Sequence, residues 1–251
     1  MFRYAELVRI LTIKEFRLRY QNSALGFLWS ILNPLLMMIV LWLVFAVFIG
    51  SSARNYPVFI LPTLLVWRYF TVSTTSALWS VIGNSSLVTR VYFPRWLLVL
   101  SSNLANLLGS SLEFAVLFPL LILLGMKVQW TILLVPVLLA VEFILIMGIS
   151  LLISPLNVRY RDMAQVWDIT LQVGFYFSPI LFDVTVIPQR YVPVFFLNPL
   201  AGLLVAIRQI LYYNSLPSST YLLLTAIAGG VLLLAGSLVF RQFEPRLAEE
   251  V

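Results

Sequence analysis

Long apolar runs separated by short charged segments dominate the chain. No residue between Arg19 and Arg54 is charged, and a helix needs about 20 apolar residues to cross a bilayer. The runs do not alternate with a period of two, which favours helices, and helices also pair their backbone groups within the segment, as lipid requires. The pattern predicts an all-α membrane protein, a single transmembrane domain over 1–251, with six transmembrane helices at 27–49, 61–82, 97–124, 131–154, 165–183 and 219–240.

Two other segments have different patterns. At helical spacing, residues 2–20 divide into an apolar side with Tyr4, Leu7, Val8, Leu11 and Leu18 and a charged side with Arg3, Glu6, Arg9, Lys14 and Arg17. This division is typical of a helix that lies in the membrane interface. Residues 186–213 are apolar but interrupted by prolines. We expect two short re-entrant helices there, before the last span, which are tolerated where protein covers them.

Composition agrees with a membrane protein, and the basic residues indicate its orientation. The chain is 61% hydrophobic and 10% charged, against roughly 25% charged in soluble domains. Most Lys and Arg residues lie in the N-terminal segment, the loops after spans two and four, and the C-terminal tail. Because basic residues collect on the cytoplasmic side, we expect a multi-pass inner-membrane protein with both termini in the cytoplasm. The same distribution explains the net charge of +6 without a nucleic-acid partner.

The sequence lacks the residues of common catalytic sites. It contains no Cys and no His, which removes thiolate metal ligands and the commonest general base. The phosphate-binding pattern G-x-x-x-x-G-K-[ST] requires a lysine after glycine, but Lys14 follows Ile13 and Lys127 follows Met126. We therefore expect no enzyme activity, metal or cofactor in this chain itself. ATP-driven transport would need a separate ATPase chain.

Polar residues within the predicted spans are costly and often functional. On the third span, Asn103, Asn106, Ser110 and Glu113 follow at helical spacing and form one stripe, and Glu142 lies near the middle of the fourth. These residues would either contact a polar substrate or protons, or form an internal hydrogen-bonded cluster between packed helices. The internal cluster is the favoured interpretation.

Aromatic residues make up 14% of the chain and gather on two predicted spans. Aromatic faces with few charges suit sugar rings, although lipid contact or core packing explains each residue taken singly. The candidates for a channel or substrate lining are Trp42, Phe45 and Phe48 on the first span, and Phe175, Tyr176, Phe177 and Phe182 on the fifth.

The loop between the second and third predicted spans, 85–95, mixes basic and aromatic residues. Pro94 ends any helix there, and we expect a turn or two of helix with Arg90, Tyr92 and Phe93 exposed to the cytoplasm. A plain connecting loop is the alternative, but exposed aromatic residues favour a partner contact.

Three regions together resemble the membrane subunit of type-2 ABC exporters that move polysaccharides. The first is Arg17-x-Arg19-Tyr20-x-x-Ser23-x-Leu25-Gly26-x-x-Trp29-x-x-x-Asn33-Pro34, and the second is Arg90-Val91-Tyr92-Phe93-Pro94-Arg95. The third comprises Asn157-Val158-Arg159-Tyr160-Arg161-Asp162, Ser178-Pro179-Ile180 and Asn198-Pro199-Leu200. The similarity covers nearly the whole chain in order and spacing, and O-antigen, teichoic-acid and capsule exporters are the most alike.

The resemblance implies a homodimer of six-helix subunits, each bound to a nucleotide-binding subunit that carries ATP and Mg²⁺. It implies that spans one and five of both subunits line a continuous channel and that the helices near 186–213 form an outer gate. It also implies that the N-terminal helix and the 85–95 loop contact the ATPase, for which the candidates are Lys14, Glu15, Arg17, Arg90, Tyr92, Phe93 and Arg95.

These expectations lead to one hypothesis and two alternatives. The hypothesis is the permease of an exporter for a lipid-linked polysaccharide, as in O-antigen export and lipopolysaccharide biosynthesis. Arginines near the inner face would receive the lipid pyrophosphate, namely Arg17, Arg19, Arg159 and Arg161. Gly26 would be a hinge between the interface helix and the channel wall. The alternatives are export of a hydrophobic drug or lipid, and an ion-coupled carrier that uses Glu113 and Glu142.

Overall fold

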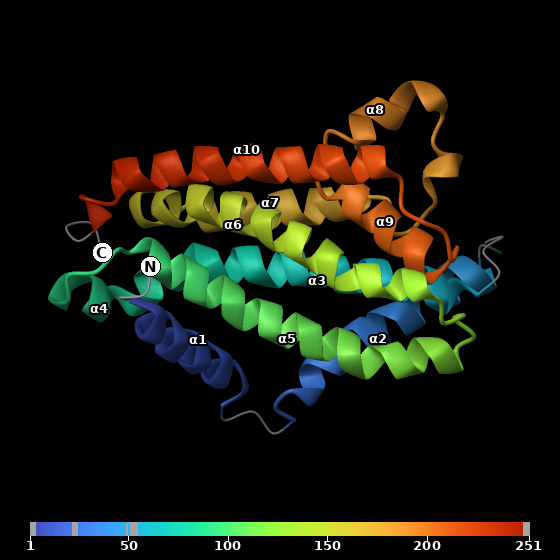
Figure 1. The fold of residues 1–251 in the computed structure, drawn as a ribbon, viewed down its shortest axis with the longest axis horizontal. Helices are drawn as coiled ribbons and strands as arrows, with labels where there is room; N and C mark the ends of the chain where they lie inside the picture. Colours follow the sequence, from blue (N-terminus) through green and yellow to red (C-terminus); the bar gives the residue numbers. More distant parts are fainter. Residues whose placement is uncertain (1–3, 22–24, 49, 51–54, 248–251) are drawn as a thin grey trace.

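The computed structural model describes residues 4–21, 25–48, 50 and 55–247, and the regular elements in these ranges are all helical, which confirms the all-α class (Figure 1). The α-helices are α1 (Ala5–Tyr20), α2 (Leu28–Trp42), α3 (Tyr56–Ser80), α4 (Ser85–Arg90), α5 (Trp96–Leu123), α6 (Val135–Arg159), α7 (Met163–Tyr176), α8 (Val192–Phe195), α9 (Ala201–Leu211) and α10 (Ser219–Phe243). Shorter elements are the π-helical η2 (Leu43–Phe48), which continues α2, and the 3-10 turns η3 (Ile82–Asn84), η4 (Trp130–Leu134), η5 (Val184–Val186) and η6 (Gln189–Tyr191).

Within the described ranges, five helical segments are long and apolar enough to cross a bilayer, rather than the six predicted. They are Leu28–Phe48, Tyr56–Ser80, Trp96–Leu123, Trp130–Arg159 and Ser219–Phe243. The prediction of a full span at 165–183 differs from the structure, because α7 has only 14 residues. Its length of about 21 Å is less than a hydrocarbon core of about 30 Å. The helix ends before Pro179, which lacks a backbone N–H and disfavours helical geometry in the preceding residue.

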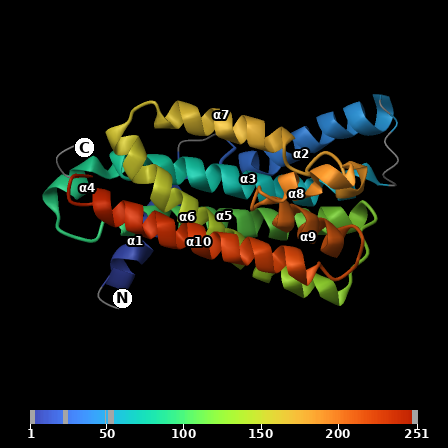
Figure 2. The same cartoon turned by 90° about the horizontal axis from the view of Figure 1, so that it is seen from above.

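α3 lies at the centre of the bundle (Figures 1 and 2). It packs against α2, α5, α6, α7 and α9, and Ile60 and Tyr69 on it are 0% exposed. This position explains why a membrane-length helix carries many hydroxyl side chains. Ser73 and Thr74 are also 0% exposed, and the Thr74 hydroxyl donates to the Phe70 carbonyl at 2.9 Å, so these groups face protein instead of lipid.

The most extensive helix pair is α6 with α10, where glycines let the two backbones approach closely. A Cβ on Gly236 would collide with the carbonyl oxygen of Gly148, and a Cβ on Gly148 would collide with the backbone of Leu232 and Leu233. Small residues at such a crossing are typical of helix packing in membranes. The opposite side of α10 is exposed, as at Leu234, and has the character of a lipid-facing surface.

α1 packs against α5 and shows most of the division predicted for residues 2–20. Leu11 is 4% exposed, whereas Glu6 and Arg9 are exposed and form an ion pair of 3.6 Å with each other. Leu18 was expected on the buried side but is 52% exposed. Burial decreases along α1, from the buried Leu11 and Thr12 to the exposed Arg17, Leu18 and Arg19, so Leu18 lies beyond the part of the apolar side that is buried.

The start of α1, α4 and the end of α10 lie at one end of the bundle, and α8 and α9 lie at the other (Figure 1). Residues 186–213 contain the two short helices that were predicted, α8 with 4 residues and α9 with 11. Most residues of α9 are buried, and α3, α6 and α10 cover it. This cover is what a non-spanning segment requires inside a membrane. That the segment 186–213 enters the membrane and returns on the same side stays a prediction.

Candidate functional site

A pocket of about 400 Å³ lies between α2 and α7, with α3 at its base. Both helices pack on α3 and lie on the same side of the bundle in Figure 2. The polar lining residues are Asn33, Arg68, Thr71 and Gln172, and the aromatic ones are Trp67, Phe175 and Tyr176. Aromatic and apolar walls that carry a few polar groups are typical of ligand-binding sites.

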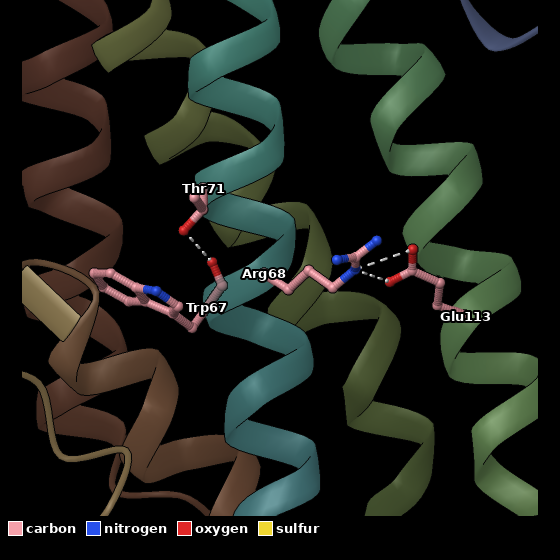
Figure 3. Close-up of polar contacts among 4 residues, drawn as sticks. All are labelled: Trp67, Arg68, Thr71 and Glu113. Carbon is pink, nitrogen blue, oxygen red and sulfur yellow. Dashed lines mark hydrogen bonds and ion pairs between the residues drawn. The ribbon is translucent and has the colours of Figure 1, made fainter. Parts of the chain in front are cut away.

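Arg68 and Glu113 form an ion pair at this base. Arg68 Nε lies 3.4 Å from Glu113 Oε1 and 3.3 Å from Oε2, which joins α3 to α5 (Figure 3). The side chain of Arg68 is 23% exposed and that of Glu113 is 8% exposed. Because an unpaired charge inside a membrane is costly, the pair explains how two membrane-length helices carry these groups. Sequence analysis singled out Glu113 but missed its partner, which is 45 positions away in the chain.

The aromatic side of the pocket is built by successive ring contacts. The rings of Trp67 and Phe175 lie 5.8 Å apart in an edge-to-face arrangement, and Phe175 contacts Tyr176 in the same way at 5.4 Å. Thr71 donates its hydroxyl to the Trp67 carbonyl at 2.9 Å (Figure 3), so that donor is occupied. Phe175 and Tyr176, two of the predicted lining residues, therefore lie in one pocket with Arg68.

The other predicted aromatic residues lie elsewhere. Phe177 and Phe182 line a second cavity of about 580 Å³ beside α8. Phe45 stacks on Tyr56 at 6.0 Å between ring centroids, whereas Trp42 and Phe48 are exposed. These three residues of α2 and η2 line neither cavity. The three aromatic candidates on the first span therefore have different surroundings, because Phe45 contacts α3 and the other two are exposed.

α7 exposes polar side chains that sequence analysis did not single out. Gln165, Asp168 and Gln172 are spaced by three and four residues, so they share one helix face, and all three are exposed. Leu171 is the one fully buried residue of this helix. The residue types and their helical spacing can be read from the sequence. They were not singled out because hydropathy averaged over the predicted span 165–183 is apolar.

Two of the family-like motifs meet at the turn after α7. Asn198 Nδ2 donates to Ser178 Oγ at 2.8 Å. Arg208 of α9 donates to the carbonyl oxygens of Ile180 and Phe182, at 2.8 Å and 3.0 Å. The side chains of Asn198 and Arg208 thus connect the segment after α7 to the α8–α9 region. The motif residues Ser178, Ile180 and Asn198 take part in these contacts.

The candidate ATPase-contacting residues of the 85–95 loop differ in exposure. Tyr92 is 98% exposed, but Phe93, which was expected to be exposed, is only 7% exposed. Phe93 belongs to a buried cluster with Leu97. Arg95 donates through its guanidinium to the Glu244 carbonyl and through its backbone N–H to the Glu244 carboxylate, the latter at 2.8 Å. Phe93 and Arg95 therefore join the loop to the rest of the fold, and Tyr92 protrudes.

The candidate ATPase-contacting residues on α1 also divide into residues that make contacts within the fold and a residue that is exposed. Lys14 Nζ donates to Asn84 Oδ1 at 2.7 Å, and Asn84 Nδ2 donates to Glu15 Oε1 at 3.3 Å. These contacts join α1 to η3. Arg17, like Arg90 of α4, is exposed.

The proposed head-group arginines do not form one cluster. They are Arg17, Arg19, Arg159 and Arg161. Arg19 donates to Ser76 Oγ on α3 at 3.0 Å, whereas Arg159 lies over the rings of Tyr160 and Phe243, at 5.7 Å and 5.8 Å. The two pairs lie at α1 and at the α6–α7 turn, which are apart in both views (Figures 1 and 2).

Gly26 lies between α1 and α2 with φ +48°. L-residues rarely adopt this left-handed conformation, so a glycine suits this position. Residues 22–24 of the predicted junction lie outside the described ranges. The hinge function stays a prediction.

The polar stripe on α5 is internal, as favoured from the sequence. Asn103, Asn106, Ser110 and Glu113 are all less than 10% exposed, at 0%, 1%, 7% and 6%. The expected hydrogen bonds between helices are present in part: Asn103 donates to Met147 Sδ on α6 and Glu113 accepts from Arg68 on α3, whereas within the described residues the Asn106 amide has no hydrogen-bond partner. Glu142 is 1% exposed, and its Oε1 has no partner there either.

Comparisons with known proteins agree with this architecture. The chain is 29% identical to the O-antigen export system permease protein RfbA of Klebsiella pneumoniae, over 97% of this chain and 94% of that protein. It is 29% identical to the protein of the same name from Myxococcus xanthus, over 100% and 97%. It is 25% identical to the polysialic acid transport protein KpsM of Escherichia coli, over 77% and 76%. Residues 6–212 match the family described as ABC-2 type transporter, and the chain therefore belongs to the ABC-2 type transporter family.

Proposed function

We propose that this protein is the membrane subunit of an ATP-driven exporter that carries a lipid-linked polysaccharide across the cytoplasmic membrane. The polysaccharide would be O-antigen-like or teichoic-acid-like. The observation that carries the proposal is the pocket between α2 and α7, where Asn33, Arg68 and Gln172 lie beside Trp67 and Phe175. Aromatic faces with amide and guanidinium donors suit a polar ring with C–H faces.

The exposed face of α7 supports a water-filled path. In contact with lipid, Gln165, Asp168 and Gln172 would be costly, so we infer that this face points into a channel shared with a second copy of the chain. α2 and α7 of each copy would form its wall. The residues after α7 would complete a sixth crossing, and the segment 186–213 would form the outer gate.

The energy would come from a partner. The chain has no phosphate-binding loop, so we infer two nucleotide-binding subunits that hold ATP and Mg²⁺, one for each copy of the chain. The exposed residues Arg17, Arg90 and Tyr92 would contact them on the cytoplasmic side, with both termini there. Lys14, Glu15, Phe93 and Arg95 would transmit force through their contacts within the fold.

The alternative cargo, a hydrophobic drug or lipid, fits the pocket less well. Three of its lining side chains, Asn33, Arg68 and Gln172, would lose hydrogen bonds to water without gaining partners from an apolar cargo, and each unmet polar group costs about 1–3 kcal/mol. The relatives compared above are named for O-antigen and polysialic acid, which agrees with a polar polymer.

Deletion and complementation of the gene test the function. Deletion should remove the polysaccharide from the cell surface and cause glycan to accumulate inside, and the wild-type gene should restore export. The double variant Asn33→Leu/Gln172→Leu should insert normally but reduce export strongly. Gln242→Leu, at the exposed end of α10, is the matched control and should export normally. An unchanged surface polysaccharide after deletion would overturn the proposal.

A further inference from the structure

The guanidinium of Arg68 is only partly used by its ion pair. Arg68 is the thirteenth of the 25 residues in α3, which places it midway along a membrane-length helix. Its hydrogen bonds to Glu113 both come from Nε. Within the residues that the structure describes, its two terminal nitrogens have no partner, and the residue lines the pocket between α2 and α7.

Arg68 is the one charged side chain among the described residues that line the pocket. Glu113 holds only the Nε of Arg68 and does not itself line the pocket. Asp168 is the one acidic residue of α7 and does not line the pocket. The charge that the pocket wall presents is therefore that of Arg68, while its partner Glu113 lies behind it on α5.

The geometry assigns to Arg68 a binding function for an oxyanion on the transported chain. Its free terminal nitrogens have the fork geometry that matches phosphate and carboxylate. The amides of Asn33 and Gln172 add neutral donors in the same pocket. The inference rests on the proposed function and deepens it, because it states that the cargo presents a phosphate or carboxylate oxygen to the channel midway through the membrane.

Glu113 has a defined part in this scheme. It neutralises Arg68 while the pocket is empty, which lowers the cost of a charge within the membrane. When an oxyanion arrives, it competes with the carboxylate for the same guanidinium. Such competition keeps binding weak enough for the cargo to leave, as conduction requires.

Anion binding by the full-length chain in nanodiscs of zwitterionic lipid tests the inference. The probes are inorganic pyrophosphate, for the lipid–glycan junction, and a trimer of galacturonic acid, for acidic sugars of the polymer. A neutral galactose trimer is the control ligand. The dissociation constants are measured by isothermal titration calorimetry on the wild type, Arg68→Gln, Glu113→Gln and the exposed control Arg190→Gln.

The two partners of the ion pair should have opposite effects. Arg68→Gln should weaken oxyanion binding at least 10-fold, whereas Glu113→Gln should keep or strengthen it, because a competing carboxylate is gone. Arg190→Gln should bind like the wild type. If a single variant does not fold, Arg68→Gln/Glu113→Gln replaces both charges with amides and should also lose binding.

Each result has a defined meaning. If only pyrophosphate binds, the oxyanion that Arg68 recognises belongs to the lipid–glycan junction. If only the galacturonic acid trimer binds, the oxyanion belongs to the sugars of the polymer. Equal losses in Arg68→Gln and Glu113→Gln, or no oxyanion binding by the folded wild type, would overturn the inference and leave a purely structural ion pair. If surface polysaccharide survives gene deletion while the purified chain still binds pyrophosphate through Arg68, the proposed function fails and the site stands.

Discussion

Arg208 of α9 holds the turn after α7 through the carbonyl oxygen of Ile180, which lies 2.8 Å from its Nη2. The guanidinium also lies 3.9 Å from the centroid of the Phe59 ring, and the residue is 2% exposed. One buried cation therefore connects α9, α3 and the segment where α7 ends. Arg208 thus supplies donors to carbonyl groups of the non-helical segment that follows α7, groups that would otherwise be left without partners inside the fold.

Arg208→Met should destabilise the protein. The substitution leaves the carbonyl oxygens of Ile180 and Phe182 without their donor, which costs roughly 2–4 kcal/mol. Thermal unfolding in nanodiscs should show a clearly lower midpoint. Arg190→Met is the control, since Arg190 is an exposed arginine that lies over the Tyr191 ring, and it should change the midpoint little. Equal midpoints for both variants would contradict the role given to Arg208.

The contact between Asp183 and Tyr213 makes the same region sensitive to acid. Burial alone would raise the pKa of Asp183, but hydrogen bonds from the Thr185 N–H and the Tyr213 hydroxyl, together with the charge of Arg208, outweigh it and lower this pKa. Burial and the bond to Asp183 raise the pKa of Tyr213 to about 12. The contact therefore contributes stability from about pH 4 to about pH 10, the ordinary values of the two groups.

Stability at low pH checks this assignment. The contribution of Asp183 is lost as the pH falls through its lowered pKa, because the protonated carboxyl is the weaker acceptor. Asp183→Asn should be less stable than the wild type at pH 7, and the difference between the two unfolding midpoints should shrink as the pH falls below about 4, the ordinary pKa of Asp. Asp168→Asn replaces an exposed carboxylate on α7 and serves as the control, because it shows how acid changes the unfolding midpoint when the Asp183 contact is intact. A constant difference between Asp183→Asn and the wild type across this range would refute the assignment.

Substitutions at Gly26 should follow backbone preference and not side-chain volume. A Cβ there would meet no atom within 4 Å, but φ is +48°, which costs non-glycine residues about 1–2 kcal/mol. Gly26→Val should impair export severalfold while membrane insertion stays normal. Gly26→Asn should retain most of the export, because asparagine tolerates this conformation. Normal export by Gly26→Val would show that the turn is not a mechanical link.

Gly236→Leu should separate α10 from α6. A side chain at this position would collide with the backbone at Gly148, and neither helix can move without losing the close packing between them. The expected result is a protein with a lower unfolding midpoint and faster proteolysis of α10. Gly230→Leu is a matched control, since a Cβ at Gly230 would meet no atom within 4 Å, and it should behave like the wild type.

Tyr92 and Phe93 should separate partner contact from folding. Tyr92→Ala removes a side chain that is 98% exposed, so it should leave stability unchanged and weaken copurification of the ATPase. Phe93→Ala removes a buried ring and should destabilise the chain by about 3–5 kcal/mol. Copurification and thermal unfolding of both variants measure the two effects. Normal ATPase binding by Tyr92→Ala would remove this residue from the proposed interface.

The sequence predicted the helices that membrane burial dictates. Runs of apolar residues define where a helix crosses lipid, and Gly26 marked the turn before the first span, since both features depend on local composition and backbone preference. The predicted span at 165–183 was less accurate. α7 ends before Pro179, and the course of the chain after it depends on contacts with Asn198 and Arg208, which are distant in the sequence. Hydropathy averaged over a window contains no information on such contacts.

The sequence by itself determined the class of protein, the positions of most spans and the absence of a phosphate-binding loop, because these depend on residue type along the chain. Tertiary structure decided which polar residues meet. The pairing of Arg68 with Glu113 joins residues 45 positions apart, and the burial of Phe93 beside an exposed Tyr92 depends on how the loop folds back on the bundle. Such contacts arise from the packing of helices in three dimensions, and the packing of α2, α3 and α7 forms the pocket that Arg68 lines.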